Sequence, residues 1–140
     1  MNGIPEVPVD GKLYLDTNLL IAWMEEIPPY GEPLAELIES QSHTVVSSEL
    51  SVAECLVQPF KQKNTVAANA YLELLDREVI TFYHVSRTIL IQSAEKRSQY
   101  SLKLPDAIHI ATAIFHDCAA FLTCDRDFRK VSDIPVLFFE

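Results

Sequence analysis

The segment KLYLDTN, residues 12–18, decides the fold because its short apolar run ends directly at an acid, Asp16. A run of this length bounded by polar residues predicts a buried strand over residues 12–15. Along the rest of the chain, segments with the spacing, caps and first-turn prolines typical of helices alternate with short apolar or β-branched runs typical of strands. The remaining strands are expected at residues 43–47, 79–83, 119–124 and 136–139, and the helices at 19–25, 33–39, 65–76, 86–99, 105–117 and from residue 48 onward.

Strands that alternate with helices predict a sheet of parallel strands, because parallel neighbours need a crossover connection. We therefore expect an α/β fold with an open, mainly parallel sheet, helices on both faces and the strand at 12–15 in its centre. Ligands of such sheets bind beyond the carboxyl ends of the strands. Acidic residues at those ends are thus the first candidates for a functional site.

The chain has 140 residues, of which 49% are hydrophobic and 22% charged, which fits one globular domain and excludes a disordered chain. Residues 1–11 are expected to form a loose lead-in to a domain over residues 12–140. No apolar run is long enough for a membrane span, and no secretory signal is apparent. Three irregularly spaced cysteines argue against a disulfide framework or a zinc site and favour a reducing cytoplasm.

The charge balance disfavours one class of partner. The chain has 20 acidic and 11 basic residues, a formal net charge of −9. Sequence-independent binding to a phosphate backbone normally needs a basic surface, which this composition does not favour. An enzyme that acts on nucleic acid stays compatible with the composition if part of the acid is concentrated in a cation site.

Asp16 and Glu54 are the first two candidate acids. Asp16 stands at the carboxyl end of the expected central strand, although it or Asn18 is also suited to cap the following helix. Glu54 falls within an apolar stripe on the expected helix from residue 48. A carboxylate on a core-facing stripe is costly unless it binds a metal or a partner, so the alternative is a buried salt bridge or a position at the rim of the stripe. The stripe consists of Leu50, Ala53, Val57 and Phe60.

Asp106, Asp125 and Asp127 complete the acidic set. Asp106 stands in the first turn of an expected helix, where an acid commonly complements the helix dipole. It shares a face with apolar residues and with His109, which is expected to be a hydrogen-bonded core histidine. Asp125 and Asp127 follow the fourth expected strand, where a simple turn is the alternative. Because all these positions are compatible with one edge of one sheet, we expect the acids to converge.

Four segments, LYLDTNLLI, SSELSVAECL, LPDAIHIATAI and FLTCDRDF, resemble in order the four acidic motifs of PIN domains, specifically the VapC-like toxin ribonucleases. The resemblance covers residues 12–139 and implies a single PIN-like domain, with a lead-in longer than is usual in the family. It implies a catalytic, metal-binding quartet of Asp16, Glu54, Asp106 and Asp125, with Asp127 as an additional metal-ligand candidate. It also implies supporting polar residues at Thr17, Asn18 and Thr123.

The resemblance implies a Mg²⁺- or Mn²⁺-dependent endoribonuclease, the toxin of a type II toxin–antitoxin pair. Clustered carboxylates independently suit such hard cations, which assist phosphodiester hydrolysis. RNA as the substrate, a cognate antitoxin and a homodimer come from the resemblance alone. Arg126, Arg129 and Lys130 are candidates to contact phosphate, with a solvated loop as the alternative. The candidate dimer contacts are Trp23, Ile89 and Leu90.

Two other functions stay open at this point. A phosphohydrolase of the haloacid-dehalogenase type also places an aspartate after its first strand, but it needs a second acid two residues later, where this chain has Asn18. A catalytically silent PIN-fold binding module would keep the fold and have no use for four converging acids. Cys118 and Cys124 are interpreted as small buried residues in any of these cases.

Overall fold

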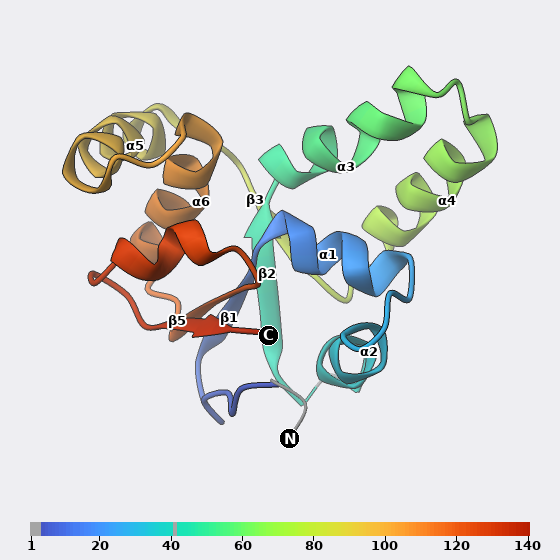
Figure 1. Ribbon diagram of the computed structural model, residues 1–140, viewed down its shortest axis with the longest axis horizontal. Helices are drawn as coiled ribbons and strands as arrows, with labels where there is room; N and C mark the ends of the chain where they lie inside the picture. Colours follow the sequence, from blue (N-terminus) through green and yellow to red (C-terminus); the bar gives the residue numbers. More distant parts are fainter. Residues whose placement is uncertain (1–3, 41) are drawn as a thin grey trace.

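The computed structural model describes residues 4–40 and 42–140, which contain one five-stranded parallel sheet (Figure 1). The strand order is β3-β2-β1-β4-β5, so β1 is central as expected. The observed strands differ from the expected ones by at most two residues at either end. They are β1 (Lys12–Leu15), β2 (Thr44–Ser48), β3 (Thr81–Tyr83), β4 (Ala120–Thr123) and β5 (Val136–Phe138).

Helices connect the strands, as expected from the sequence. α1 begins directly after β1 because the Asp16 carboxylate caps it, accepting a hydrogen bond from the Thr17 N–H at 2.8 Å. A short 3-10 helix after β4, η1, was not predicted, because a five-residue polar segment shows no detectable period. The helices are α1 (Thr17–Met24), α2 (Gly31–Glu39), α3 (Leu50–Lys61), α4 (Thr65–Asp76), α5 (Arg87–Tyr100), α6 (Leu104–Phe115) and η1 (Arg126–Lys130).

Both faces of the sheet are covered, which confirms the expected α/β architecture. The side chains of β1 alternate between two cores, as strand geometry requires. Leu13 and Leu15 pack on the side of α1 and α2, whereas Tyr14 packs on the side of α6 (Figure 1). Because β1 is buried between these layers, its carboxyl end and Asp16 are held in the middle of the sheet edge.

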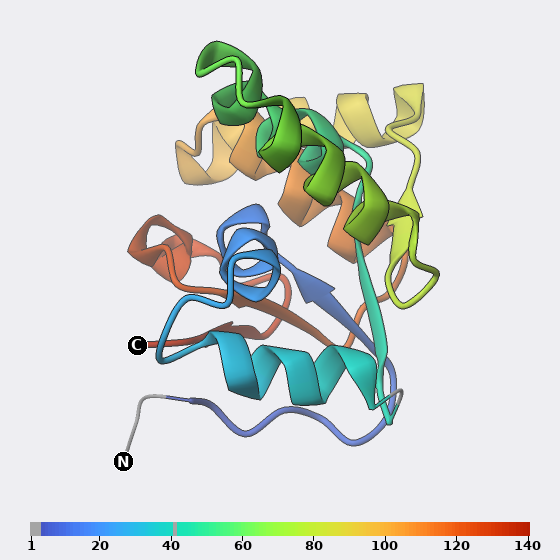
Figure 2. The same cartoon turned by 90° about the vertical axis from the view of Figure 1, so that its right-hand side faces the viewer.

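α3 and α4 form a helical hairpin that projects from the sheet (Figures 1 and 2). The core-facing stripe predicted on α3 is wrong, since Val57 and Phe60 are 53% and 61% exposed. α3 packs mainly against α4 and not flat on the sheet, so a different and narrower face is buried. The buried residues of α3 are Ser51, Cys55, Leu56 and Pro59. Glu54 therefore lies at the edge of the buried face and not inside an apolar stripe.

The lead-in is partly packed. Residues 4–11 run below α2 in Figure 2, and Ile4 and Val7 pack against the core on the α1–α2 side of the sheet. Residues 4–11 are therefore partly packed rather than loose as expected, and residues 1–3 of the expected lead-in lie outside the described residues. Within the described ranges, no helix has the length and apolar character that a membrane crossing requires.

The candidate dimer contacts need a correction. Trp23 is 4% exposed and Ile89 is 1% exposed, because both pack inside their own chain. Leu90, at 45%, is the one member of the predicted set that is available to a partner. The helical pattern in the sequence identified apolar residues correctly but could not separate a core face from a contact surface.

Candidate functional site

Three carboxylates meet at the carboxyl edge of the sheet, where an oxygen atom from each of Asp106, Asp125 and Asp127 lies within 4.8 Å of the others. We call these three residues the acidic cluster. Asp125 follows β4 and caps η1, its Oδ1 accepting a hydrogen bond from the Asp127 N–H at 2.9 Å. Asp106 stands in the first turn of α6. The fold thus brings a helix N-terminus and the end of a strand together.

Asp16 lies near the acidic cluster and is only 4% exposed. Its Oδ1 caps α1, and its Oδ2 accepts a hydrogen bond from the Thr123 hydroxyl at 2.7 Å. The same hydroxyl accepts a hydrogen bond from the Asp125 N–H at 2.9 Å, so Thr123 ties the ends of β1 and β4 together. Burial raises the pKa of Asp16, and the charge of His109 and the hydrogen bonds offset this only in part. Asp16 is therefore a helix cap and a neighbour of the cluster at once.

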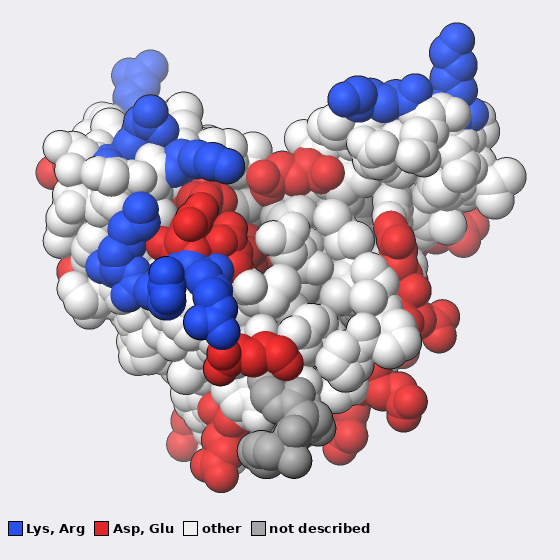
Figure 3. Space-filling model, in the orientation of Figure 1, with Lys and Arg blue, Asp and Glu red and all other residues white. Residues whose placement is uncertain are grey.

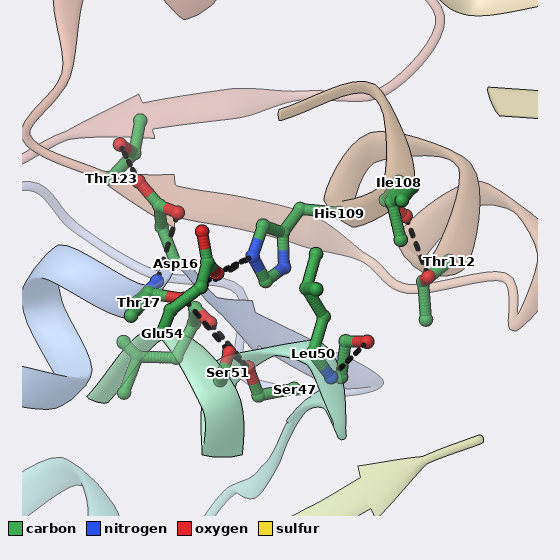
Figure 4. Close-up of polar contacts among 12 residues, drawn as sticks. Asp16, Thr17, Ser47, Leu50, Ser51, Glu54, Ile108, His109, Thr112 and Thr123 are labelled. Carbon is green, nitrogen blue, oxygen red and sulfur yellow. Dashed lines mark hydrogen bonds and ion pairs between the residues drawn. The ribbon is translucent and has the colours of Figure 1, made fainter. Parts of the chain in front are cut away.

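Glu54 approaches from α3, with 32% of its side chain exposed. Its Oε1 accepts hydrogen bonds from the Thr17 hydroxyl at 2.8 Å and from His109 Nε2 at 2.7 Å (Figure 4). Burial alone would raise the pKa of Glu54, but the hydrogen bonds and the charge of His109 outweigh it and lower that pKa. Glu54 thus has a hydrogen-bonded partner in His109, which forms the ion pair of the salt-bridge alternative when its ring is protonated. The charge of Glu54 also reaches Asp106.

Asp106 lies in surroundings that disfavour its ionised form. Burial, followed by the charges of Asp16 and Asp125, raises its pKa from 3.8 to about 6. Within residues 4–40 and 42–140, no hydrogen bond or ion pair of its carboxylate is found. A half-buried carboxylate that has no partner and lies among like charges is an arrangement that a bound cation relieves.

His109 belongs to this site as well as to the core. It was expected to be a satisfied core histidine, and this is confirmed, since it is 1% exposed and both ring nitrogens have partners. Its partners, however, belong to the site: Nε2 contacts Glu54 and, at 3.2 Å, the Thr17 hydroxyl, and the Tyr14 hydroxyl lies 2.6 Å from Nδ1. The sequence signal for this role was the spacing of three residues from Asp106 on one helix face.

Thr17 connects the acids to a row of hydroxyl groups that sequence reasoning missed. Its hydroxyl lies 2.8 Å from that of Ser51, which in turn lies 3.0 Å from that of Ser47 (Figure 4). Ser47 also donates a hydrogen bond to the Leu15 carbonyl at 2.9 Å. This row joins β1, β2 and α3 behind Glu54, and no local pattern in the sequence indicates it.

The remaining candidates lie at the surface. Asn18 is exposed in the first turn of α1 and, in the described part of the chain, makes no contact with the acids. Arg126, Arg129 and Lys130 are exposed on η1, and Arg126 forms an ion pair with Glu140 at 2.6 Å. Figure 3 shows acidic side chains gathered near the middle of one face, with Lys and Arg side chains around them on the side of α5, α6 and η1.

Comparisons with known proteins identify relatives of this architecture. The family model of the PIN domain matches residues 13–134. A structure of VapBC2 from Rickettsia felis bound to a promoter DNA fragment contains a similar chain, with 16% identity, a TM-score of 0.75 and coverage of 92% of this chain and 99% of that one. No curated protein sequence matches significantly.

Two further solved structures are similar. A chain of a toxin–antitoxin complex from Klebsiella pneumoniae is 25% identical, with a TM-score of 0.70 over 91% of this chain and 98% of that one. VapC20 of Mycobacterium tuberculosis, a toxin that cleaves the sarcin–ricin loop, is 17% identical, with a TM-score of 0.65 over 78% of this chain and 86% of that one. The structural neighbours are thus toxins of toxin–antitoxin complexes, and none of these matches supports the haloacid-dehalogenase alternative.

Proposed function

We propose that this chain, which belongs to the PIN domain family, is a Mg²⁺- or Mn²⁺-dependent endoribonuclease and the toxin of a type II toxin–antitoxin pair. Members of this family are typically nucleases. The observation that carries the proposal is the meeting of the partnerless Asp106 with Asp125 and Asp127 within 4.8 Å, near the buried Asp16. Without a cation, the repulsion between these four carboxylates would destabilise the folded protein.

The donor set suits a hard divalent cation, because it consists of carboxylate oxygens and no thiolate. Asp106, Asp125 and Asp127 would hold the ion, with Asp16 and Glu54 as the neighbouring ligands. When bound, such a cation supplies a Lewis acid that polarises a phosphodiester and lowers the pKa of water.

The chain's own residues prepare the site for this chemistry. Thr123 and the Thr17 N–H fix the two oxygens of Asp16, so that this carboxylate does not need to reorganise when a ligand arrives. The exposed Arg129 and Lys130 lie on η1, the same short helix as Asp127, and we infer that they bind phosphates of an RNA strand. Local basic side chains are needed because the net charge of −9 repels RNA elsewhere.

Partners and location belong to the same proposal. Relatives have been crystallised as toxin–antitoxin complexes, some bound to DNA, and we extend a cognate antitoxin to this chain on that basis. The homodimer rests on the family resemblance alone. All three cysteines are free, and two of them are buried, which supports a reducing cytoplasm.

RNA cleavage by the purified protein tests the function. We expect the wild type and Glu73→Gln, a change at an exposed acid on α4, to cleave single-stranded or structured RNA with Mn²⁺. EDTA or the change Asp106→Asn should remove most of the cleavage. Unchanged cleavage in EDTA would contradict the metal-dependent mechanism. A wild type that binds Mn²⁺ but cleaves no RNA would favour the silent binding module.

A further inference from the structure

A buried chain of three side chains runs from the sheet to Glu54. Tyr14, in β1, is fully buried, and its hydroxyl lies 2.6 Å from Nδ1 of His109. The opposite ring nitrogen, Nε2, lies 2.7 Å from Oε1 of Glu54. Because a carboxylate oxygen only accepts, Nε2 carries the proton of this hydrogen bond. The Tyr14 hydroxyl can donate or accept, so it satisfies Nδ1 in either charge state of the ring.

The position of His109 is set by packing on several sides. Its ring meets that of Tyr14 edge-on, with centroids 5.8 Å apart. Tyr14 stacks on Phe121 of β4 at 5.1 Å, and Phe121 contacts Phe128 of η1 at 4.8 Å. Phe128 is fully buried, and its neighbours in the sequence are Asp127 and Arg129. The same aromatic stack therefore supports both His109 and the segment that carries Asp125 and Asp127 of the acidic cluster.

Glu54 needs such support because its helix does not provide it. α3 belongs to the projecting hairpin, and the Glu54 side chain is 32% exposed, so its rotamers are not limited by close packing. Both of its hydrogen bonds, from His109 and from Thr17, go to Oε1. In the described part of the chain, Oε2 has no hydrogen-bond partner and stays available to a ligand.

We propose that His109 is a positioning residue, which holds Oε1 of Glu54 so that Oε2 is presented to the cation, and that Tyr14 fixes His109 for this task. The inference rests on the proposed cation site. Hydrogen-bond partners behind a metal ligand orient it, and their loss typically weakens metal binding about 10- to 100-fold. The positioning role acts through Glu54, so its loss should depend on the Glu54 carboxylate, which general destabilisation would not.

The test measures Mn²⁺ affinity by calorimetry, which is independent of RNA cleavage. His109→Leu removes the donor to Glu54 and should weaken Mn²⁺ binding about 10-fold or more. His109→Gln keeps an N–H donor near the position of Nε2 and should stay within about threefold of the wild type. Thr112→Val is the matched control, because it alters another fully buried polar residue of α6, whose hydroxyl bonds the Ile108 carbonyl and not the site.

The same His109 variants are then compared in a Glu54→Gln background. The inference predicts that His109→Leu causes no further loss of Mn²⁺ affinity there, because the residue it positions has lost its charge. An equal loss in both backgrounds would show a merely structural role and overturn the inference. If His109→Leu does not fold, Tyr14→Phe, which removes one hydroxyl from a packed ring, takes its place. It should weaken Mn²⁺ binding in the chain that keeps Glu54 and cause no further loss in the Glu54→Gln background.

The outcomes separate the two proposals. A wild type that binds Mn²⁺ and cleaves RNA, together with a His109→Leu variant of unchanged Mn²⁺ affinity, overturns the positioning role and leaves the proposed function intact. A wild type that binds Mn²⁺ with the predicted dependence on His109 but cleaves no RNA supports the positioning role and contradicts the nuclease. A wild type that binds no Mn²⁺ overturns both.

Discussion

Replacing Asp106 with Asn removes one charge from the acidic cluster and keeps the shape of the side chain. In the metal-free protein, burial and the charges of Asp16 and Asp125 raise the pKa of Asp106 from 3.8 to about 6. A pKa difference of this size corresponds to about 3 kcal/mol of penalty on the ionised form. Since the carboxylate is partly exposed, solvent screening reduces this, and we take about 2 kcal/mol as the penalty at neutral pH.

The change also removes a favourable interaction. An acid in the first turn of α6 complements the helix dipole, which contributes about 0.3–1 kcal/mol. The net effect of Asp106→Asn on the metal-free protein is therefore a gain of about 1–2 kcal/mol in the free energy of unfolding. For a domain of this size, such a gain raises Tm by about 3–8 °C.

Thermal melting in EDTA measures the metal-free stability, and melting in Mn²⁺ measures the stabilisation by the cation. In EDTA, Asp106→Asn should melt higher than the wild type, and Glu73→Gln should melt like it. Mn²⁺ should stabilise the wild type and Glu73→Gln clearly and Asp106→Asn much less, because only binding to the folded state raises Tm. A lower Tm of Asp106→Asn in EDTA, with the response to Mn²⁺ retained, would refute the reasoning and indicate a structural acid.

The remaining predictions concern pH, a threonine and the exposed face of α3. Because the pKa of Asp106 is raised in the folded state, its side chain is protonated and costs no stability below about pH 4, and the stability falls as the pH rises through about 6 and the carboxylate ionises. The Tm advantage of Asp106→Asn in EDTA should therefore be small at pH 4 and largest above pH 7. Thr123→Val should lower the stability by about 2 kcal/mol in urea unfolding, because it leaves Oδ2 of the buried Asp16 and the Asp125 N–H without a partner. An unchanged midpoint would contradict this. Phe60→Ser should change the same midpoint by no more than about 0.5 kcal/mol, since Phe60 is 61% exposed, and a core-sized loss would contradict the observed packing of α3.

The parts of the fold that depend on short-range signals could be predicted from the sequence. β1 was recognisable because an apolar run ends at Asp16, and the alternation of strands with helices predicts a parallel sheet. The central place expected for β1 is confirmed by the strand order of the structure. The meeting of Asp106 with Asp125 followed from the same topology, because a strand end and a helix start share one sheet edge.

The parts that depend on tertiary packing could not be predicted. The spacing of Val57 and Phe60 indicated a core face, yet both side chains are exposed because α3 packs mainly against α4. A helical period identifies an apolar face but not the element that packs against it. His109 lies 55 residues from Glu54 and 95 from Tyr14, so only the folded chain reveals that it joins them. Thr17 and Ser51, 34 residues apart, form a hydrogen bond that no local pattern indicates either.

The central claim is that the acidic cluster holds a divalent cation. Diffraction from crystals soaked in Mn²⁺, recorded at the manganese absorption edge, locates such an ion directly. We predict an anomalous difference peak between the carboxylates of Asp106, Asp125 and Asp127, and its loss in crystals of Asp106→Asn. A peak that avoids these residues, or the absence of any peak at Mn²⁺ concentrations that support RNA cleavage, would contradict the account.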